Sequence, residues 1–342
     1  MPSWDLDARL QQAPRRWLVT GAAGFIGSHL VETLLAKGQV VVGLDSFSTG
    51  HRENLDDAVG RAGQGSKERW RFIEGDIASQ PSARAACQEV DFVLHQAALG
   101  SVPRSISDPL ATHQSNVTGF LSMLVAARDA GVKRFVYASS SSVYGDDPAL
   151  PKREAQTGRV LSPYAATKAM NELYAGVFQK SYGLEVVGLR YFNVFGPRQD
   201  PAGAYAAVVP RWLAALARGE PCDINGDGTT SRDFCFVANA VQANLRAALA
   251  EGPTVHDTVY NVAVGGRTSL TRLYEMIRER VGRVRPEVLG LAPRYRPFRP
   301  GDIKDSQADT SRAGERLGYV PTHTIEQGLD VTVSRFLEEH HT

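Results

Sequence analysis

A turn built on three glycines constrains the fold of this chain more than any other feature. The apolar run Trp17–Thr20 leads directly into it, and apolar residues at helical spacing follow it. The three glycines are Gly21, Gly24 and Gly27. In such a unit the first glycine permits the tight turn, the second lets backbone N–H groups approach a pyrophosphate, and the third allows close packing of helix on strand. The segment therefore predicts a dinucleotide-binding unit, with Phe25 and Ile26 at a helix N-terminus that faces the phosphates.

Apolar runs of strand length recur along the first half of the chain. They are Val40–Leu44, Arg71–Ile73, Phe92–Leu94, Phe135–Ala138 and Val186–Leu189. Continuous apolar runs are typical of parallel strands buried on both faces, and the stretches between them have helical spacing. Two of these stretches are long, Leu110–Asp129 and Pro163–Tyr182, and a glycine follows each closely. We therefore predict an α/β fold with a doubly wound parallel Rossmann sheet.

The chain becomes less regular after about Tyr191, with several prolines and a segment rich in proline and arginine. We therefore expect the dinucleotide-binding Rossmann domain over residues 15–190 and a second, smaller α/β substrate lobe over residues 191–342. The apolar run Val259–Val264 leaves another arrangement open, in which residues 237–281 return to the first domain.

The composition excludes several classes of protein. Lys plus Arg number 38 and Asp plus Glu 37, so the net charge of +1 argues against nucleic acid or a membrane as the main partner. Residues 1–14 carry acids and no long apolar run, so we expect a frayed polar lead with one amphipathic turn rather than a signal peptide. No segment is apolar enough to span a bilayer. A soluble cytoplasmic protein is expected.

Cysteines and histidines give no sign of a disulfide framework or a metal site. Cys87, Cys222 and Cys235 are odd in number and far apart, so no CxxC pair is present. The eight histidines are scattered, without an acid–histidine cluster. We therefore expect free thiols and no bound metal.

The acid Asp45 ends the second predicted strand, where a carboxylate can bond both hydroxyls of an adenosine ribose. A 2′-phosphate would be repelled there, Ser46 follows the acid, and the nearest basic residue is Arg52. NAD is therefore favoured over NADP. Asp76 and Ile77 follow the third strand and are expected to contact the adenine, although a simple turn cap is the alternative for Asp76.

Tyr164 and Lys168 stand one helical turn apart, so their side chains share a helix face. Ser140 follows the fifth predicted strand, at the sheet edge where open α/β folds bind ligands. A phenol with a pKa of about 10 is a poor base near neutrality, and lowering that pKa by three units requires roughly 4 kcal/mol of stabilisation. The Lys168 ammonium can supply part of it, and a cationic nicotinamide ring more. The arrangement predicts Tyr164 as the acid and base of an NAD-linked reaction.

Taken together, these segments resemble the extended short-chain dehydrogenase/reductase family and, within it, the nucleotide-sugar 4-epimerases that act on UDP-hexoses. The likeness runs from Trp17 to about Tyr319. The segments that carry it are the acid Asp45, GAAGFIGSHL, GDI, HQAA, SSSSVYG, SPYAATK, LRYFNVFGPRQ and GDGTTSRDF.

The resemblance implies a role for each matching residue. Ser140 would be the catalytic hydroxyl, with Ser142 nearby. Tyr164 would be the acid and base, and Lys168 the partner of the cofactor ribose and of the phenolate. Further cofactor contacts would be Gln96, Ala97, Ala98, Asn116 and Tyr191. Contacts to the UDP part would come from Asn193, Ala207, Val208, Arg232, Arg299 and Asp302. Arginine suits this role because a planar guanidinium matches phosphate oxygens.

Family dehydratases place acidic residues just after the catalytic hydroxyl, whereas this chain has Ser141 and Ser142 there. The expected reaction is therefore epimerisation, in which a 4-keto sugar turns about its diphosphate link and receives the hydride on its opposite face. The resemblance implies that three small residues would leave room beside C2 of the sugar: Gly100, Ser101 and Ser306. They favour interconversion of UDP-GlcNAc and UDP-GalNAc.

Several alternatives stay open. The substrates could be the corresponding UDP-N-acetylhexosaminuronic acids, whose carboxylate Arg104 would favour, or UDP-glucose and UDP-galactose. A non-enzymatic NAD-sensing protein is an alternative from another class, although the presence of both Tyr164 and Lys168 speaks against it. A net oxidoreductase is a further rival. The resemblance also implies a homodimer in which the two long helices pair with their copies.

Overall fold

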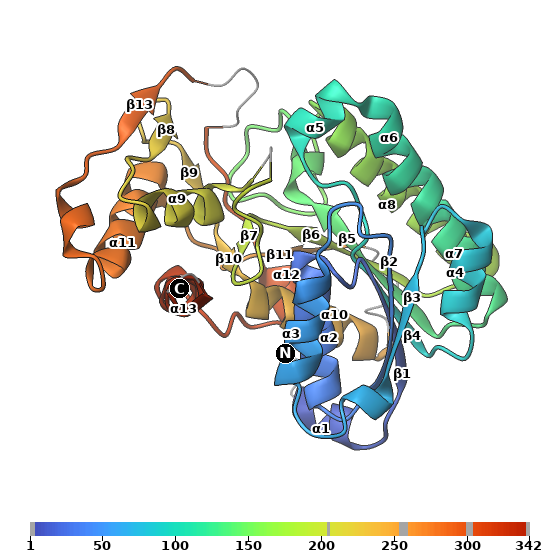
Figure 1. The fold of residues 1–342 in the computed structure, drawn as a ribbon. Helices are drawn as coiled ribbons and strands as arrows, with labels where there is room; N and C mark the ends of the chain where they lie inside the picture. The colour runs from blue at the N-terminus through green and yellow to red at the C-terminus, as the bar shows by residue number, and fades with distance from the viewer. Residues whose placement is uncertain (1–3, 204–205, 253–258, 299–303, 340–342) are drawn as a thin grey trace.

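A seven-stranded parallel sheet forms the centre of the molecule (Figure 1). The computed structural model describes residues 4–203, 206–252, 259–298 and 304–339. In sheet order the strands are β11 (Val259–Val262), β6 (Val186–Tyr191), β5 (Arg134–Ser140), β4 (Phe92–His95), β1 (Arg16–Thr20), β2 (Val40–Asp45) and β3 (Trp70–Glu74). Every neighbouring pair is parallel. The six predicted strands and the doubly wound fold are confirmed.

Helices cover both faces of this sheet. Three of them pack on one face: α2 (Phe25–Ala36), α3 (Arg52–Arg61) and α10 (Val237–Leu249). Three pack on the other face: α4 (Gln80–Cys87), α7 (Phe120–Asp129) and α8 (Pro163–Tyr182). Trp17 and Val19 of β1 join the first core and Leu18 the second. Because successive side chains of a strand point to opposite faces, burial of both faces explains why β1 is a continuous apolar run.

The helix predicted over Leu110–Asp129 is helical throughout but changes its winding in the middle. A short α6 (Pro109–His113) leads into the π-helical segment η2 (Gln114–Gly119), which continues into α7. Gly119 lies so close to Ile77 that an added Cβ would meet its side chain at 2.7 Å. The predicted extent of this helix is confirmed, and its middle turn is π-helical. Helix α8 has its predicted bounds and ends at Gly183, with φ 70°.

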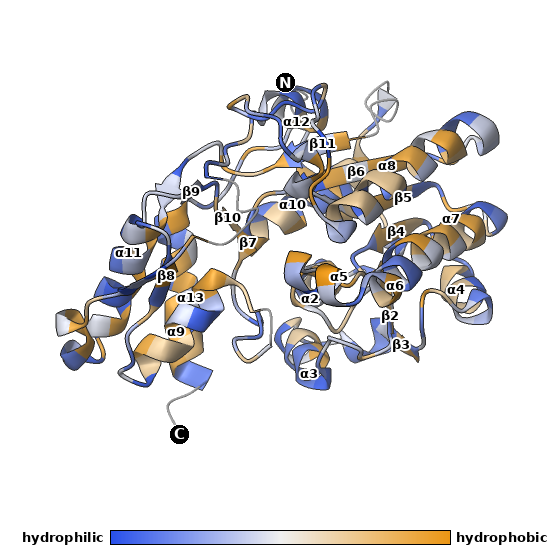
Figure 2. Ribbon diagram, turned by 90° about the horizontal axis from the view of Figure 1, so that it is seen from above, coloured by the Kyte–Doolittle hydropathy of each residue, from blue (hydrophilic) through white to orange (hydrophobic). Residues whose placement is uncertain are grey.

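A smaller lobe follows the sixth strand of the sheet. Its helices are α9 (Val208–Ala217), α11 (Leu270–Gly282) and α13 (Ile325–Glu339). Its short strands pair two by two: β7 (Val194–Phe195) with β10 (Cys235–Phe236), β9 (Ser231–Arg232) with β12 (Thr268–Ser269), and β8 (Asp223–Asn225) with β13 (Arg294–Arg296). Trp212, Leu273 and Leu329 belong to its core. Figure 2 shows α9, α11 and α13 grouped apart from α4, α6, α7 and α8.

The two lobes are interleaved along the chain. Residues 237–281 were considered as a segment that returns to the first domain. In this segment α10 packs on the sheet and β11 pairs with β6, whereas α11 packs in the smaller lobe. The remaining short helices are α1 (Leu6–Gln11), α5 (Val102–Ser107), α12 (Ser311–Leu317), η1 (Lys67–Arg69), η3 (Ser141–Tyr144) and η5 (Pro286–Gly290). Helix α12 also packs against the sheet core.

The expectation of a frayed lead before Arg15 is wrong for α1. Leu10 of this helix is buried in the sheet core. Arg9 donates from Nη1 to the backbone oxygen of Leu249 at 2.7 Å, and Lys37 pairs with Asp7 at 2.7 Å. These contacts are made with residues far away in the chain, so the local pattern of the sequence does not show them.

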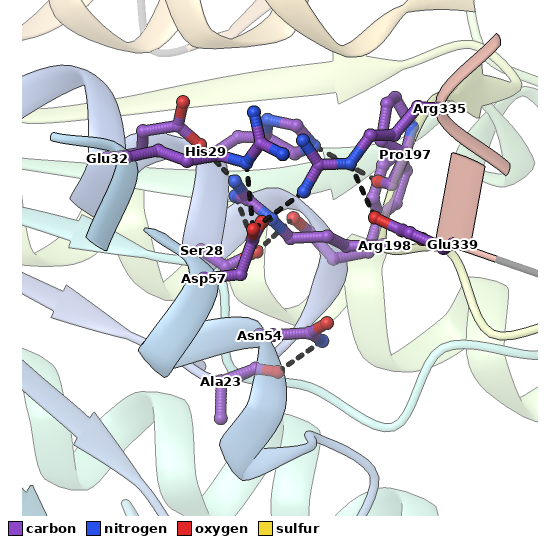
Figure 3. Close-up of polar contacts among 12 residues, drawn as sticks. Ala23, Ser28, His29, Glu32, Asn54, Asp57, Pro197, Arg198, Arg335 and Glu339 are labelled. Atoms are coloured by element: carbon purple, nitrogen blue, oxygen red, sulfur yellow. Dashed lines mark hydrogen bonds and ion pairs between the residues drawn. The ribbon is translucent and has the colours of Figure 1, made fainter. Parts of the chain in front are cut away.

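An ion-pair network joins the two lobes (Figure 3). Arg198, in the connection after β7, donates from Nε to Asp57 Oδ2 at 2.8 Å and also pairs with Glu32. Arg335 of α13 donates to Asp57 Oδ1 at 2.6 Å. Arg198 has φ 63°, in the left-handed region that residues other than glycine seldom adopt. We call Glu32, Asp57, Arg198 and Arg335 the Arg198 network. This network links α2 and α3 to α13.

Within the described ranges, no helix combines the length and the apolar character needed to cross a bilayer. The three cysteines are buried and free. Among the same residues, His, Cys, Asp and Glu side chains form no group of three or more that could hold a metal ion.

Candidate active site

The glycine turn joins the end of β1 to α2 with no room for side chains. Gly21 has φ 65° and donates its N–H to Leu44 O at 2.9 Å, and Gly24 is the N-cap of α2. An added Cβ on Gly21 would lie 2.7 Å from the backbone nitrogen of Ala97, and one on Gly27 would lie 2.0 Å from Gly21 O. Glycine is therefore required at both positions, and the N–H groups that open α2 face outward from the sheet edge.

A cavity of about 300 Å³ lies at this edge. Nine of the predicted cofactor residues line it: Gly21, Gly24, Asp45, Ser46, Asp76, Ile77, Gln96, Ala97 and Ala98. They come from the carboxyl ends of β1, β2, β3 and β4, and the strand order reverses between β1 and β4. Open α/β sheets bind nucleotides at this kind of switch point. The glycine cradle and its acid fit the pyrophosphate and the adenosine of NAD.

Asp45 holds the glycine turn in place. Its Oδ2 accepts the Ala23 N–H at 2.9 Å and its Oδ1 accepts the Phe47 N–H at 2.8 Å. Burial raises the pKa of Asp45, and these backbone donors oppose that rise. Arg52 lies over the Phe47 ring and pairs with Glu74 at 3.2 Å, so its charge is directed to another acid. This pairing is consistent with a ribose site that takes no 2′-phosphate.

Some predicted cofactor residues have their side chains engaged by protein groups. Asn116, 2% exposed, accepts the Leu99 N–H at 2.8 Å and donates to Leu99 O and to Thr167 Oγ1. The Tyr191 hydroxyl donates to Gln96 Oε1 at 3.0 Å. Neither Asn116 nor Tyr191 is among the residues that line the cavity. Both hold lining segments in position from the protein side, and a role in direct cofactor binding stays a prediction for them.

Phe25 and Ile26 form the first turn of α2, and their side chains pack against apolar cores of the molecule. The Phe25 ring packs edge-on against His29 at 5.8 Å. Asn54 of α3 was not predicted, yet its side chain donates to Ala23 O at 2.9 Å and fixes the turn from α3 (Figure 3). Sequence gave no signal for Asn54 because an asparagine in a polar helix is unremarkable without its partner.

Ser140, Tyr164 and Lys168 come together at the carboxyl end of β5. The Ser140 hydroxyl lies near the Tyr164 phenol and lowers its pKa. Lys168 is buried, donates from Nζ to Ala138 O at 2.8 Å, and lies 5.9 Å from the centre of the Tyr164 ring. Ser162 caps the helix by accepting the Ala165 N–H at 3.1 Å, which fixes the start of α8. The residues predicted from the sequence thus form one cluster.

The pKa shifts of Tyr164 and Lys168 indicate that the cluster needs a further positive charge. Burial raises the pKa of Tyr164, while the Ser140 hydroxyl lowers it. Burial lowers the pKa of Lys168 to about 8, against the opposing effect of the Glu172 carboxylate. A phenol in this setting becomes a base only if a further positive charge lies beside it. A cationic nicotinamide ring would provide that charge.

Ser142 lies next to this cluster, on η3. Its backbone N–H donates to Ser140 Oγ at 3.1 Å. Its own Oγ is buried and has no hydrogen-bond partner among the residues that the structure describes. A buried hydroxyl without a partner is costly, so this oxygen is suited to a polar group of a bound ligand.

A larger cavity of about 700 Å³ adjoins the first. The loop after β4 lines both, with Gln96–Leu99 in the smaller and Gly100–Pro103 in the larger. The predicted substrate residues that line the larger cavity are Gly100, Ser101, Asn193, Ala207, Val208 and Arg232. Ser306 is not among these lining residues; its N–H donates to Ser231 O at 3.1 Å, and its contact with the sugar stays a prediction. Arg299 and Asp302 lie outside the described residues.

Asp233 is a further residue of this region that the sequence did not single out. It is buried and accepts the N–H groups of Val264, Gly265 and Ala308 at 3.0 to 3.2 Å. Burial raises its pKa to about 6. Asp233 follows Arg232 directly in the chain. Its carboxylate therefore holds the loop after β11 and the segment before α12 close to Arg232.

Comparison with known proteins places this chain in a family. A family model described as "NAD dependent epimerase/dehydratase family" matches residues 17–263. The chain belongs to this family. Membership confirms the predicted resemblance, the Rossmann fold, the expectation of an enzyme and NAD as its cofactor.

Similar proteins cover nearly the whole chain. A UDP-glucose 4-epimerase of Mycolicibacterium smegmatis is 39% identical over 94% of this chain and 98% of its own length. The solved structure of a UDP-N-acetylglucosamine 4-epimerase from Methanobrevibacter ruminantium, in complex with UDP-N-acetylmuramic acid, is 37% identical, with a TM-score of 0.87 over 96% of this chain and 100% of that chain. The solved structure of a UDP-glucose 4-epimerase from Thermotoga maritima, with UDP-glucose, is 34% identical. Its TM-score is 0.85, and the match covers 95% of this chain and 99% of that chain.

Proposed function

We propose that this protein catalyses the reversible C4 epimerisation of UDP-GlcNAc and UDP-GalNAc through a 4-keto intermediate. The observation that carries the proposal is the cluster of Ser140, Tyr164 and buried Lys168 at the carboxyl edge of the sheet, the edge that also bears the glycine turn and its cavity. Similarity to 4-epimerases of UDP-sugars over nearly the whole chain supports the reaction class.

The two lobes divide the binding of cofactor and substrate. The glycine turn would receive the NAD pyrophosphate, Asp45 the adenosine ribose, and Asp76 the adenine. Bound NAD supplies the hydride acceptor and donor for the sugar carbon. In the smaller lobe, Arg232 would hold the diphosphate of UDP, with Arg299 and the other predicted contacts of that lobe completing the site.

The proton is handled by the α8–β5 cluster. Tyr164 takes the proton of the C4 hydroxyl, and Ser140, which lies near the same phenol, orients that hydroxyl. The Lys168 ammonium stabilises the Tyr164 phenolate that accepts this proton. After the keto sugar has turned, Tyr164 returns the proton to the same oxygen. Ser141 and Ser142 offer no carboxylate for removing a second proton, so elimination does not compete.

Room around Gly100 supports the acetylated substrates. An added Cβ at Gly100 would meet nothing within 4 Å, so the space beside this residue of the larger cavity is open. The neighbouring Ser101 offers a hydroxyl that accepts the Arg104 N–H at 3.2 Å and can also donate to an acetamido oxygen. A similar protein from Methanobrevibacter ruminantium is named a UDP-N-acetylglucosamine 4-epimerase.

Two other substrate pairs remain as alternatives. UDP-glucose and UDP-galactose are favoured by the names of the relatives from Mycolicibacterium smegmatis and Thermotoga maritima. The UDP-N-acetylhexosaminuronic acids need a cation near C6, and Arg104 is not among the residues that line the larger cavity. The case for Arg104 as the partner of a substrate carboxylate is therefore weaker than it was from the sequence alone.

We also propose that the protein forms a homodimer. Helices α5, α6 and α8 expose an unusual number of large apolar side chains: Ile106, Leu110, Met170, Leu173, Tyr174 and Val177. Leu110 is 82% exposed and Leu173 71%. Exposed apolar side chains gathered on neighbouring helices are typical of an interface between protein subunits.

The test is to incubate the pure NAD-bound protein with each UDP-sugar, without added cofactor, and to separate the epimers. The proposal expects conversion of UDP-GlcNAc to UDP-GalNAc with a higher kcat/KM than for UDP-glucose or the uronic acids. A sensor would convert none of them. A net oxidoreductase would instead need added NAD and release NADH in proportion to product, seen as growing absorbance at about 340 nm.

A further inference from the structure

A buried ion pair lies next to the catalytic cluster and has no part in the reaction as outlined. Glu172 of α8 accepts from Arg190 of β6 through both carboxylate oxygens, at 2.9 Å from Nε and 2.7 Å from Nη2. The side chains are 15% and 5% exposed. Burial of such a pair seldom stabilises a fold more than apolar residues would, so its presence calls for another explanation.

The position of Glu172 on α8 suggests that explanation. Tyr164, Lys168 and Glu172 follow one another at intervals of one helical turn, so all three lie on one face of the helix. Glu172 Oε1 accepts the Ser139 hydroxyl at 2.6 Å, and Lys168 donates to Ala138 O at 2.8 Å. Two side chains of α8 thus hold the last residues of β5 directly before Ser140.

Glu172 also acts on the charge of Lys168. The titratable groups that face this ammonium are Tyr164 and Glu172 on α8 and His95 on β4. His95 is buried and neutral, because burial lowers its pKa to about 3. In the part of the chain that the structure describes, the Glu172 carboxylate is the charge that favours the protonated form of Lys168, against the effect of burial.

We propose that Glu172 is a positioning residue for proton transfer, which fixes Ser140 against Tyr164 and keeps Lys168 cationic. The inference rests on the proposed epimerase function and deepens it. Arg190 serves this arrangement from the other side, since it balances the charge of Glu172 without contacting Lys168. Its guanidinium stacks on the Tyr144 ring at 4.8 Å and donates to Glu154 O at 3.2 Å.

The anchoring of Arg190 explains why the test belongs at Glu172. Tyr144 donates to Asn261 Oδ1 at 2.6 Å, and the Asn261 amide donates to Lys152 O and Asp309 O. Removing Arg190 would therefore leave Glu172 unpaired and disturb contacts across both lobes. Glu172→Gln keeps the shape and an acceptor for Ser139, and it removes the charge and one of the two oxygens that accept from Arg190.

Glu185→Gln is the matched control. Glu185 pairs with Arg134 at 2.7 Å, at the opposite end of β5, so this change also removes one charge from an ion pair beside the same strand. Both variants and wild type are prepared as NAD-bound protein, checked by thermal unfolding, and assayed with the UDP-sugar that wild type converts best, over a range of pH.

We expect Glu172→Gln to lower kcat about 10- to 100-fold, with KM changed less than about threefold, because positioning rather than substrate binding is lost. The alkaline limb of its kcat profile should move to lower pH by about one unit, since Lys168 loses its proton more easily without the carboxylate. Glu185→Gln should match wild type in both respects.

Equal kcat and equal alkaline limbs in the two variants would overturn the role of Glu172 and leave the epimerase function standing. Wild-type protein that converts no UDP-sugar would overturn both. If Glu172→Gln does not fold, Ser139→Ala tests the contact from its other side. It should lower kcat roughly tenfold at unchanged KM, as expected for one lost hydrogen bond to a charged group, and wild-type kcat in that variant would refute the proposal.

Discussion

Replacing Arg198 with methionine would remove the guanidinium at the centre of the Arg198 network and keep its hydrocarbon stem. The side chain is 5% exposed and pairs with both Glu32 and Asp57. Because the network joins α2 and α3 to α13, its loss should weaken the contact between the two lobes as well as the local packing.

The size of the effect follows from what is left behind. Breaking a buried ion pair by removing one partner costs roughly 3 to 5 kcal/mol when the other charge stays buried. Here Glu32 and Asp57 are 28% and 29% exposed, and Asp57 keeps Arg61 and Arg335 as partners. Water and these partners reduce the penalty, so we expect a loss of about 2 to 3 kcal/mol in the free energy of unfolding.

Urea unfolding followed by tryptophan fluorescence measures this loss, with Trp17 in the sheet core and Trp212 in the core of the smaller lobe. Arg52→Met is the control, because Arg52 and Glu74 form an ion pair that is 59% and 65% exposed and worth less than about 1 kcal/mol. Should Arg198→Met lose no more stability than this control, the reasoning about the network is refuted.

Three further predictions follow from the site. Tyr164→Phe should lower kcat by about 10²- to 10⁴-fold while NAD stays bound, and a variant that keeps more than a tenth of the activity would remove Tyr164 from proton transfer. Gly100→Leu should lower kcat/KM for UDP-GlcNAc about 10- to 200-fold relative to UDP-glucose, because the added side chain fills open space beside the substrate; an unchanged ratio places the acetamido group elsewhere. The pKa of Asp233 is raised to about 6, above its unfolded value, so its contribution to stability is present at low pH and is lost as the pH rises through 6. The unfolding free energy of wild type relative to Asp233→Asn should therefore fall between about pH 4 and pH 6, and a flat difference contradicts the raised pKa.

The glycine turn and the strands could be predicted because their cause is local. Gly21 and Gly27 stand where an added Cβ would collide with backbone, and Trp17–Val19 of β1 form an apolar run because both faces of the sheet are covered. The positions of Ser140 and Tyr164 followed from the same topology, since carboxyl ends of parallel strands meet at one edge.

Features made by distant partners could not be predicted in this way. Helix α1 is held in place by a hydrogen bond from Arg9 to Leu249, 240 residues away in the chain. The pairing of Glu172 with Arg190 joins a helix to a strand, and each residue alone is an ordinary charged side chain. The resemblance places Ser306 beside the sugar, and its backbone pairs with Ser231, so its contact with the sugar stays a prediction.

The fate of the hydrogen on C4 tests the central claim most directly. UDP-GlcNAc carrying deuterium at C4 is incubated with the NAD-bound protein in ordinary water, and the masses of both epimers are measured at equilibrium. The account predicts that both epimers keep the deuterium, because one hydride leaves the carbon and returns to its other face. Deuterium lost to water from either epimer would contradict it.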